Sequence, residues 1–192
     1  MKKLSIFILV LSLMLISGSA LADSHMNMME KGTWNLGIDY DMGGTLDSTN
    51  QSGMENDWDV NSGFTINGEY VIPYRDKISI GGGLGYQLSR SLSEDESSEF
   101  NFTPLYGIFK YDMEEEAYVI GHLGYNMLSA NDEFKSNAEL SGGLYYAAGF
   151  GIGMEQYNGE IIYSVNNGGW DDGTDKLDLS YSKLSLSFGY EF

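Results

Sequence analysis

The sequence contains no cysteine, and this absence excludes several kinds of site. Without thiols there can be no disulfide, no thiolate metal ligand, no cysteine nucleophile and no lipid attached to an N-terminal cysteine. Basic residues are also scarce, since 10 Lys and Arg stand against 28 Asp and Glu, for a formal net charge of −18. We therefore expect no nucleic-acid partner, because binding a polyanion requires a basic surface that displaces counterions.

Proline is nearly absent, with 2 residues, whereas glycine accounts for 25 of the 192 residues and aromatic residues for 14%. This composition is not typical of disorder, and it favours many extended segments in which small and large side chains alternate. The length corresponds to one domain, or at most two small ones.

The N-terminus has the three regions of a secretory signal peptide. Met1-Lys2-Lys3 is a short basic start, residues 4–16 form an apolar stretch, and Ala20-Leu21-Ala22 is an A-x-A cleavage site. The apolar stretch is too short for a membrane-spanning helix, which takes about 20 residues. We predict a cleaved signal peptide over residues 1–22, with Ala20 and Ala22 specifying cleavage, and a short tail over residues 23–31. The alternative is an N-terminal membrane anchor.

Apolar and polar residues alternate with a period of two from residue 32 to the C-terminus, and this pattern predicts strands. Pro104 and the pair Ser182-Lys183 mark two places where we expect a change of register or a bulge, because the apolar residues change face there. The predicted strands are eight in number and cover residues 33–42, 58–72, 78–88, 100–111, 118–128, 144–155, 160–166 and 184–192.

The connections between these strands alternate in length. The long, polar ones cover residues 43–56, 90–98, 129–142 and 167–176, and the short ones cover residues 73–76, 112–116 and 156–158. In an up-and-down arrangement every long loop then lies at one end of the sheet and every short turn at the other.

Alternation alone does not say which face of the strands is buried. A soluble barrel of lipocalin type would bury the apolar face, whereas a membrane barrel turns that face to lipid and its polar face to the lumen. Glycine crowds the polar face at residues 81, 83, 85, 149, 151 and 153, where small residues would make room for long polar neighbours in a narrow lumen. Tyr and Trp gather near strand ends, as in a membrane girdle. We therefore predict an all-β fold over residues 32–192, an eight-stranded antiparallel up-and-down transmembrane β-barrel.

The sequence resembles the small outer-membrane β-barrel family, which includes the barrel of outer membrane protein A and the eight-stranded surface barrels. The signal peptide, the eight strands, the terminal alternation of apolar residues and the segment over residues 117–126, which is similar to the family's fifth strand, carry the resemblance. The resemblance implies a host with two membranes, contact with outer-membrane lipid and lipopolysaccharide, and a C-terminal signal read by the barrel-assembly machinery. That signal is Leu184, Leu186, Phe188, Tyr190 and Phe192.

The polar face supplies candidate lumen residues. Because bases are scarce on the strands, we expect the lumen acids to rely on hydroxyl and amide donors or on water. Two interpretations stay open, a hydrogen-bonded plug that fills the barrel and an acidic conduit that prefers cations; the narrow eight-stranded geometry favours the plug. The predicted polar network consists of Asp39, Glu69, Gln87, His122, Asn126, Glu155 and Glu160.

An enzymatic role is not expected. The lipid A deacylases among outer-membrane barrels place Ser two residues after His, and here Gly124 follows His122 at that spacing. Acidic clusters at residues 94–96, 132–133 and 171–175 have no EF-hand spacing, so neither a metal site nor a cofactor is predicted.

The leading hypothesis is an integral outer-membrane barrel with a structural or surface-exposed role, a polar plugged lumen and acidic extracellular loops, acting as a monomer. The alternatives are a channel or transporter for small solutes and a soluble ligand-binding barrel.

Overall fold

The computed structural model describes residues 32–113, 116–135 and 138–192. The predicted signal peptide, its cleavage residues Ala20 and Ala22, and the tail over residues 23–31 lie outside the described residues. In the described part of the chain, no helix is both long enough and apolar enough to cross a membrane.

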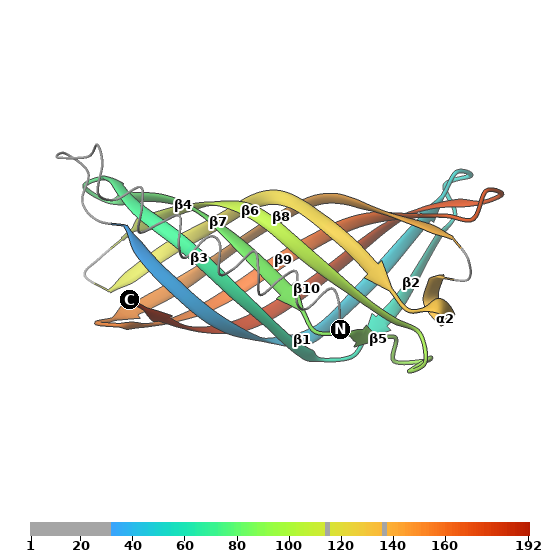
Figure 1. The fold of residues 1–192 in the computed structure, drawn as a ribbon, viewed down its shortest axis with the longest axis horizontal. Helices are drawn as coiled ribbons and strands as arrows, with labels where there is room; N and C mark the ends of the chain where they lie inside the picture. The colour runs from blue at the N-terminus through green and yellow to red at the C-terminus, as the bar shows by residue number, and fades with distance from the viewer. Residues whose placement is uncertain (1–31, 114–115, 136–137) are drawn as a thin grey trace.

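Eight long antiparallel strands form the fold (Figure 1). Each pairs with the next along the chain, and the last pairs with the first, so that the sheet closes into an up-and-down barrel. The predicted eight-stranded antiparallel barrel is confirmed. The eight strands are β1 (Thr33–Asn50), β3 (Gly63–Arg75), β4 (Ile78–Gln87), β6 (Glu99–Asp112), β7 (Ala117–Ala130), β8 (Glu139–Met154), β9 (Tyr157–Asp171) and β10 (Lys176–Glu191).

Three short elements lie at one end of the barrel, opposite the C-terminus (Figure 1). They are β2 (Glu55–Val60), which pairs with the second half of β1, β5 (Arg90–Ser91), which pairs with β6, and the single-turn helix α2 (Asp132–Lys135). We call this end the loop end, and the end with the short β3–β4, β6–β7 and β8–β9 connections the turn end.

The strands extend further toward the loop end than the sequence pattern indicated. The ladders of β1 with β2 and β10, and of β9 with β8 and β10, take up most of the predicted long loops over residues 43–56 and 167–176 and part of the one over residues 129–142. The connection between β9 and β10 shrinks to residues 172–175. Inter-strand hydrogen bonds continue there because backbone pairing does not need an apolar outer face.

The prediction of a single strand over residues 58–72 is wrong. The structure has two strands there, β2 and β3, which residues 61–62 separate. Val60 consequently points into the barrel and is buried, whereas Phe64 points outward and is exposed. The register of β1 shifts between Asp41 and Gly44, and that of β8 shifts between residues 142 and 145. Each shift likewise changes which residues of the strand point into the barrel. A single extra residue moves the following side chains to the other face of a strand.

The irregularities predicted at Pro104 and at Ser182-Lys183 are absent from β6 and β10. The β6–β7 and β9–β10 ladders run without a shift through both places. The apolar residues change face in the sequence because the barrel interior itself becomes apolar toward the loop end. Its buried apolar cluster there consists of Leu46, Val60, Phe100, Phe102, Leu128, Leu179 and Tyr181.

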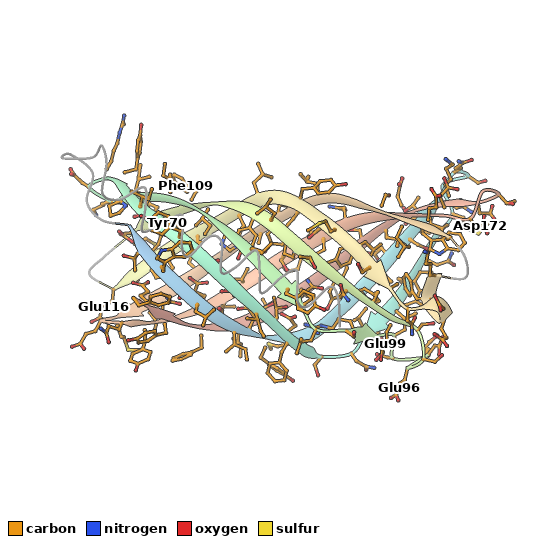
Figure 2. The ribbon with its side chains drawn as sticks, viewed as in Figure 1. Tyr70, Glu96, Glu99, Phe109, Glu116 and Asp172 are labelled. Atoms are coloured by element: carbon orange, nitrogen blue, oxygen red, sulfur yellow. The ribbon has the colours of Figure 1, made fainter. Side chains whose placement is uncertain are left out.

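The outside of the barrel carries a belt of exposed apolar side chains, to which all eight long strands contribute. Figure 2 draws the side chains around the ribbon. Of the residues that it labels, Phe109 belongs to this belt and lies near the turn end, as does Tyr70, whereas the acids Glu96, Glu99 and Asp172 lie at the loop end. Water would not favour such a surface, since soluble monomers rarely expose large contiguous apolar patches. The belt includes Leu36, Ile38, Phe64, Ile66, Leu105, Phe109, Leu123, Tyr125, Leu144, Phe150, Ile161, Tyr163, Leu184 and Leu186.

Candidate functional site

A charged cluster crosses the middle of the barrel interior around Asp41 of β1. Its carboxylate lies within 2.7 Å of Lys183 Nζ and also pairs with the guanidinium of Arg90. Ser185 Oγ and Thr65 Oγ1 donate further hydrogen bonds to it, at 2.6 and 2.7 Å. The three charged side chains are at most 5% exposed, so this cluster joins β1, β3, β5 and β10 across the lumen.

Two glutamates lie between this cluster and the turn end, and each is held by a tyrosine hydroxyl. Tyr106 donates to Glu69 Oε1 at 2.8 Å, and Tyr118 donates to Glu160 Oε1 at 2.7 Å. Asn35 adds a 3.3 Å bond to the other oxygen of Glu69. Hydrogen bonding of this kind offsets the cost of burying carboxylates without a cation for each.

His122 stacks on the ring of Tyr106, with ring centroids 4.5 Å apart, and its Nδ1 lies 3.4 Å from the Tyr145 hydroxyl. Its Nε2 is 3.9 Å from Glu69 Oε1. These contacts hold the imidazole packed inside the lumen. Gly124 occupies the position two residues after His122, where the deacylase pattern has Ser.

The structure places the other predicted lumen residues as follows. Asp39 accepts a 2.8 Å bond from Asn67, Gln87 reaches Asn166 at 3.4 Å, and Asn126 is fully buried. Glu155 does not lie in the lumen. It is exposed in the β8–β9 turn with φ 52°, because β8 ends at Met154 and the tight turn requires a left-handed residue there.

Interior glycines accommodate these large polar side chains, as the composition suggested. A Cβ on Gly83 would lie 2.6 Å from the Tyr106 ring and 3.0 Å from Glu69 Cγ. A Cβ on Gly151 would overlap the Tyr118 ring. The alternation of glycine with large residues therefore allows each tyrosine–glutamate pair to cross a narrow barrel.

The cavities along the lumen differ in size and character. A polar cavity of about 110 Å³ at the turn end is lined by Glu69, Lys110, Glu160 and Glu191, among others. A central one of about 30 Å³ lies beside Lys183 and has room for little more than water. A third cavity, of about 450 Å³, opens at the loop end and is walled by Leu46, Trp58, Leu92, Phe134, Trp170 and Leu177. We call it the loop-end cavity.

Comparisons with known proteins agree with the architecture. The chain is similar to Ail, the attachment invasion locus protein of Yersinia pestis, with 15% identity and a TM-score of 0.51 over 84% of this chain and 99% of that one. Neisserial surface protein A gives 13% identity and a TM-score of 0.51 over 85% and 99% of the chains. Outer membrane protein AlkL gives 15% and 0.53 over 88% and 94%. The chain has the fold of the small outer-membrane β-barrels. No protein-family model matches the sequence, and neither does any curated protein.

Sequence reasoning about this outer-membrane-type barrel missed Arg90, which it assigned to a loop. The residue is 1% exposed, and its guanidinium also donates to the carbonyl of Phe64 at 2.8 Å. The expectation that the lumen acids rely on hydroxyl and amide donors or on water therefore fails at Asp41, which pairs with two cations. Glu69 and Glu160 do accept hydrogen bonds from hydroxyl or amide donors. The available signal was an isolated base two residues after a predicted strand in a chain that has few bases.

The loop-end cavity was also missed, because Trp58 was assigned to the outer face of a strand and Phe134 and Trp170 to loops. The nearby acidic clusters do not form a cation cage: among the described residues, no group of three or more His, Asp or Glu is arranged to hold a metal ion.

Proposed function

We propose that the protein is an integral outer-membrane barrel that is closed to solutes and acts as a surface protein through its loop end. The observation that carries this proposal is the belt of exposed apolar side chains around a closed barrel with a polar interior. In lipid this distribution is favourable, since the outer face meets acyl chains and the eight long strands close on themselves through the β1–β10 ladder. The soluble ligand-binding barrel would need the opposite distribution.

The proposed location depends on the predicted leader over residues 1–22, cleaved after Ala22, and on recognition by the barrel-assembly machinery. The proposed signal residues Leu184, Leu186, Phe188 and Tyr190 are exposed on β10, and Phe192 follows them at the C-terminus. Fractionation tests the location: we expect a folded, heat-modifiable monomer in the outer-membrane fraction. Recovery in soluble form without detergent would contradict the proposal.

Closure to solutes is supported by the Asp41 cluster and by the small central cavity. In planar bilayers at moderate salt, the purified protein is expected to give little or no steady conductance. The alternative of a small-solute channel would be favoured by reproducible cation-selective conductance that Glu69→Gln abolishes.

In the proposed orientation the loop end faces outward, where its acids meet lipopolysaccharide, directly or through divalent cations. Glu94 and Glu96 are exposed in the β5–β6 connection, so a glutamate-specific protease added to intact cells should cleave there. Cleavage that requires opened cells would contradict the orientation. Trypsin is not expected to cut at Arg90, because that side chain is buried.

A further inference from the structure

The loop-end cavity has the dimensions of a ligand site. Its volume of about 450 Å³ falls within the range of small-molecule pockets, roughly 300–1,000 Å³. It lies at the opposite end of the barrel from the tyrosine–glutamate pairs, so the polar network of the lumen does not reach it. Nothing in the proposed surface role uses this space.

The floor of the cavity is apolar and sealed. Leu46 and Leu179 line it and belong to the buried cluster that also contains Phe100, Phe102 and Tyr181. Phe100 and Phe102 are 1% and 0% exposed, and the ring of Tyr181 stacks on Phe102 at 6.3 Å. A molecule that enters from the loop end therefore meets apolar surface and stops above the charged cluster.

The walls are aromatic and held in place before any ligand arrives. Trp170 Nε1 donates to the carbonyl of Lys135 at 3.2 Å, which ties the indole to α2. Phe134 of α2 packs on Phe100 at a centroid distance of 5.3 Å. Trp58 packs against the same buried cluster. A preformed site of this kind loses little side-chain entropy on binding.

The rim of the cavity is acidic. Glu94, Asp95 and Glu133 line it, and none of the described residues that line the cavity is a lysine or an arginine. The hydroxyls of Ser97 and Ser98 donate to Asp95 at 2.6 Å. These hydrogen bonds lower the pKa of the Asp95 carboxyl, which keeps it ionised in neutral solution. The formal charge of the whole chain, −18, adds to the negative potential at this opening.

From this combination we infer that the loop-end cavity binds an organic cation with an apolar, aromatic body. The body contacts the leucines and the faces of the two tryptophans, and the cationic group lies at the rim. Both the carboxylates and the π faces of Trp58 and Trp170 attract a positive charge, whereas an anion of the same shape is repelled.

The three tryptophans of the chain make this inference measurable. Trp58 and Trp170 line the cavity, whereas Trp34 lies on β1 against Tyr70, at a centroid distance of 4.9 Å. The probes are trimethylphenylammonium, its neutral isostere tert-butylbenzene and the anion benzenesulfonate, titrated into protein reconstituted in lipid nanodiscs. In a Trp34→Phe variant, trimethylphenylammonium should change the fluorescence saturably. The Trp58→Phe, Trp170→Phe double variant, which keeps only Trp34, should show no change.

The rim variant Glu94→Gln, Asp95→Asn, Glu133→Gln should weaken cation binding about tenfold or more and leave tert-butylbenzene unaffected. The matched control removes three exposed acids near the same end that do not line the cavity, by Glu55→Gln, Asp172→Asn and Asp175→Asn. It should change cation binding less than threefold. If the triple rim variant fails to fold, Glu94→Gln alone should still weaken cation binding measurably.

Equal affinity for all three probes, or unchanged cation binding by the folded rim variant, would overturn the inference. So would a saturable response from Trp34 alone. The assay uses isolated protein in a bilayer, so its outcome does not depend on the proposed cellular location, and the two proposals can fail separately.

Discussion

Replacing Asp41 by asparagine should test whether the central cluster holds the barrel together. The change keeps the size of the side chain, so no cavity forms, but it leaves Arg90 and Lys183 buried without their shared carboxylate. Removing one partner of a buried ion pair costs about 3–5 kcal/mol, because the remaining charge is uncompensated. Thr65 donates to Oδ2 and Ser185 to Oδ1 of Asp41. The single amide oxygen of asparagine can accept only one of these two bonds, so the loss combines the missing charge with one missing hydrogen bond.

The free energy of unfolding is measured by urea titration of protein refolded into lipid vesicles, followed by tryptophan fluorescence. Asp47→Asn is the matched control, since Asp47 lies on the same strand and is exposed; it should change the stability by no more than about 0.5 kcal/mol. Adding Lys183→Met to the Asp41→Asn protein removes one orphaned cation and should recover part of the loss. A loss below about 1 kcal/mol for Asp41→Asn would refute this reasoning and indicate that water already solvates both cations.

Other substitutions test separate parts of the structure. Gly151→Ala places a Cβ in the Tyr118 ring and should destabilise the barrel by about 1–3 kcal/mol, whereas Gly153→Ala, whose Cβ has only an oxygen at 4.0 Å, should be nearly neutral in the same titration. Deleting Phe192 should lower the yield of heat-modifiable folded protein in the outer membrane, and an unchanged yield would remove the C-terminal residues from the assembly argument. The exposed pair of Lys176 with Asp171, at 2.7 Å, lowers the pKa of Asp171, so its small stabilisation should be present at neutral pH, fade as the pH falls below the ordinary value of 3.8, and weaken with added salt.

The sequence alone determined the architecture, because strand periodicity is a local property. Residues such as Leu36, Ile38 and Tyr40 alternate with polar neighbours whatever the rest of the chain does, and the repetition of that pattern with short turns permits few folds. Glycine on the polar face also indicated a narrow lumen, and the space that Gly83 leaves for Tyr106 agrees with this.

The site depended on the tertiary structure. The β1 irregularity between Asp41 and Gly44 decides that Leu46 points inward, and nothing in the local pattern distinguishes such a bulge from a loop. Arg90 and Lys183 are 93 positions apart in the sequence (183 − 90) and share one carboxylate only because the barrel closes between β10 and β1. The loop-end cavity has the same origin: Trp58 and Trp170 come from strands that are distant in sequence, and only closure of the sheet brings both over one apolar floor.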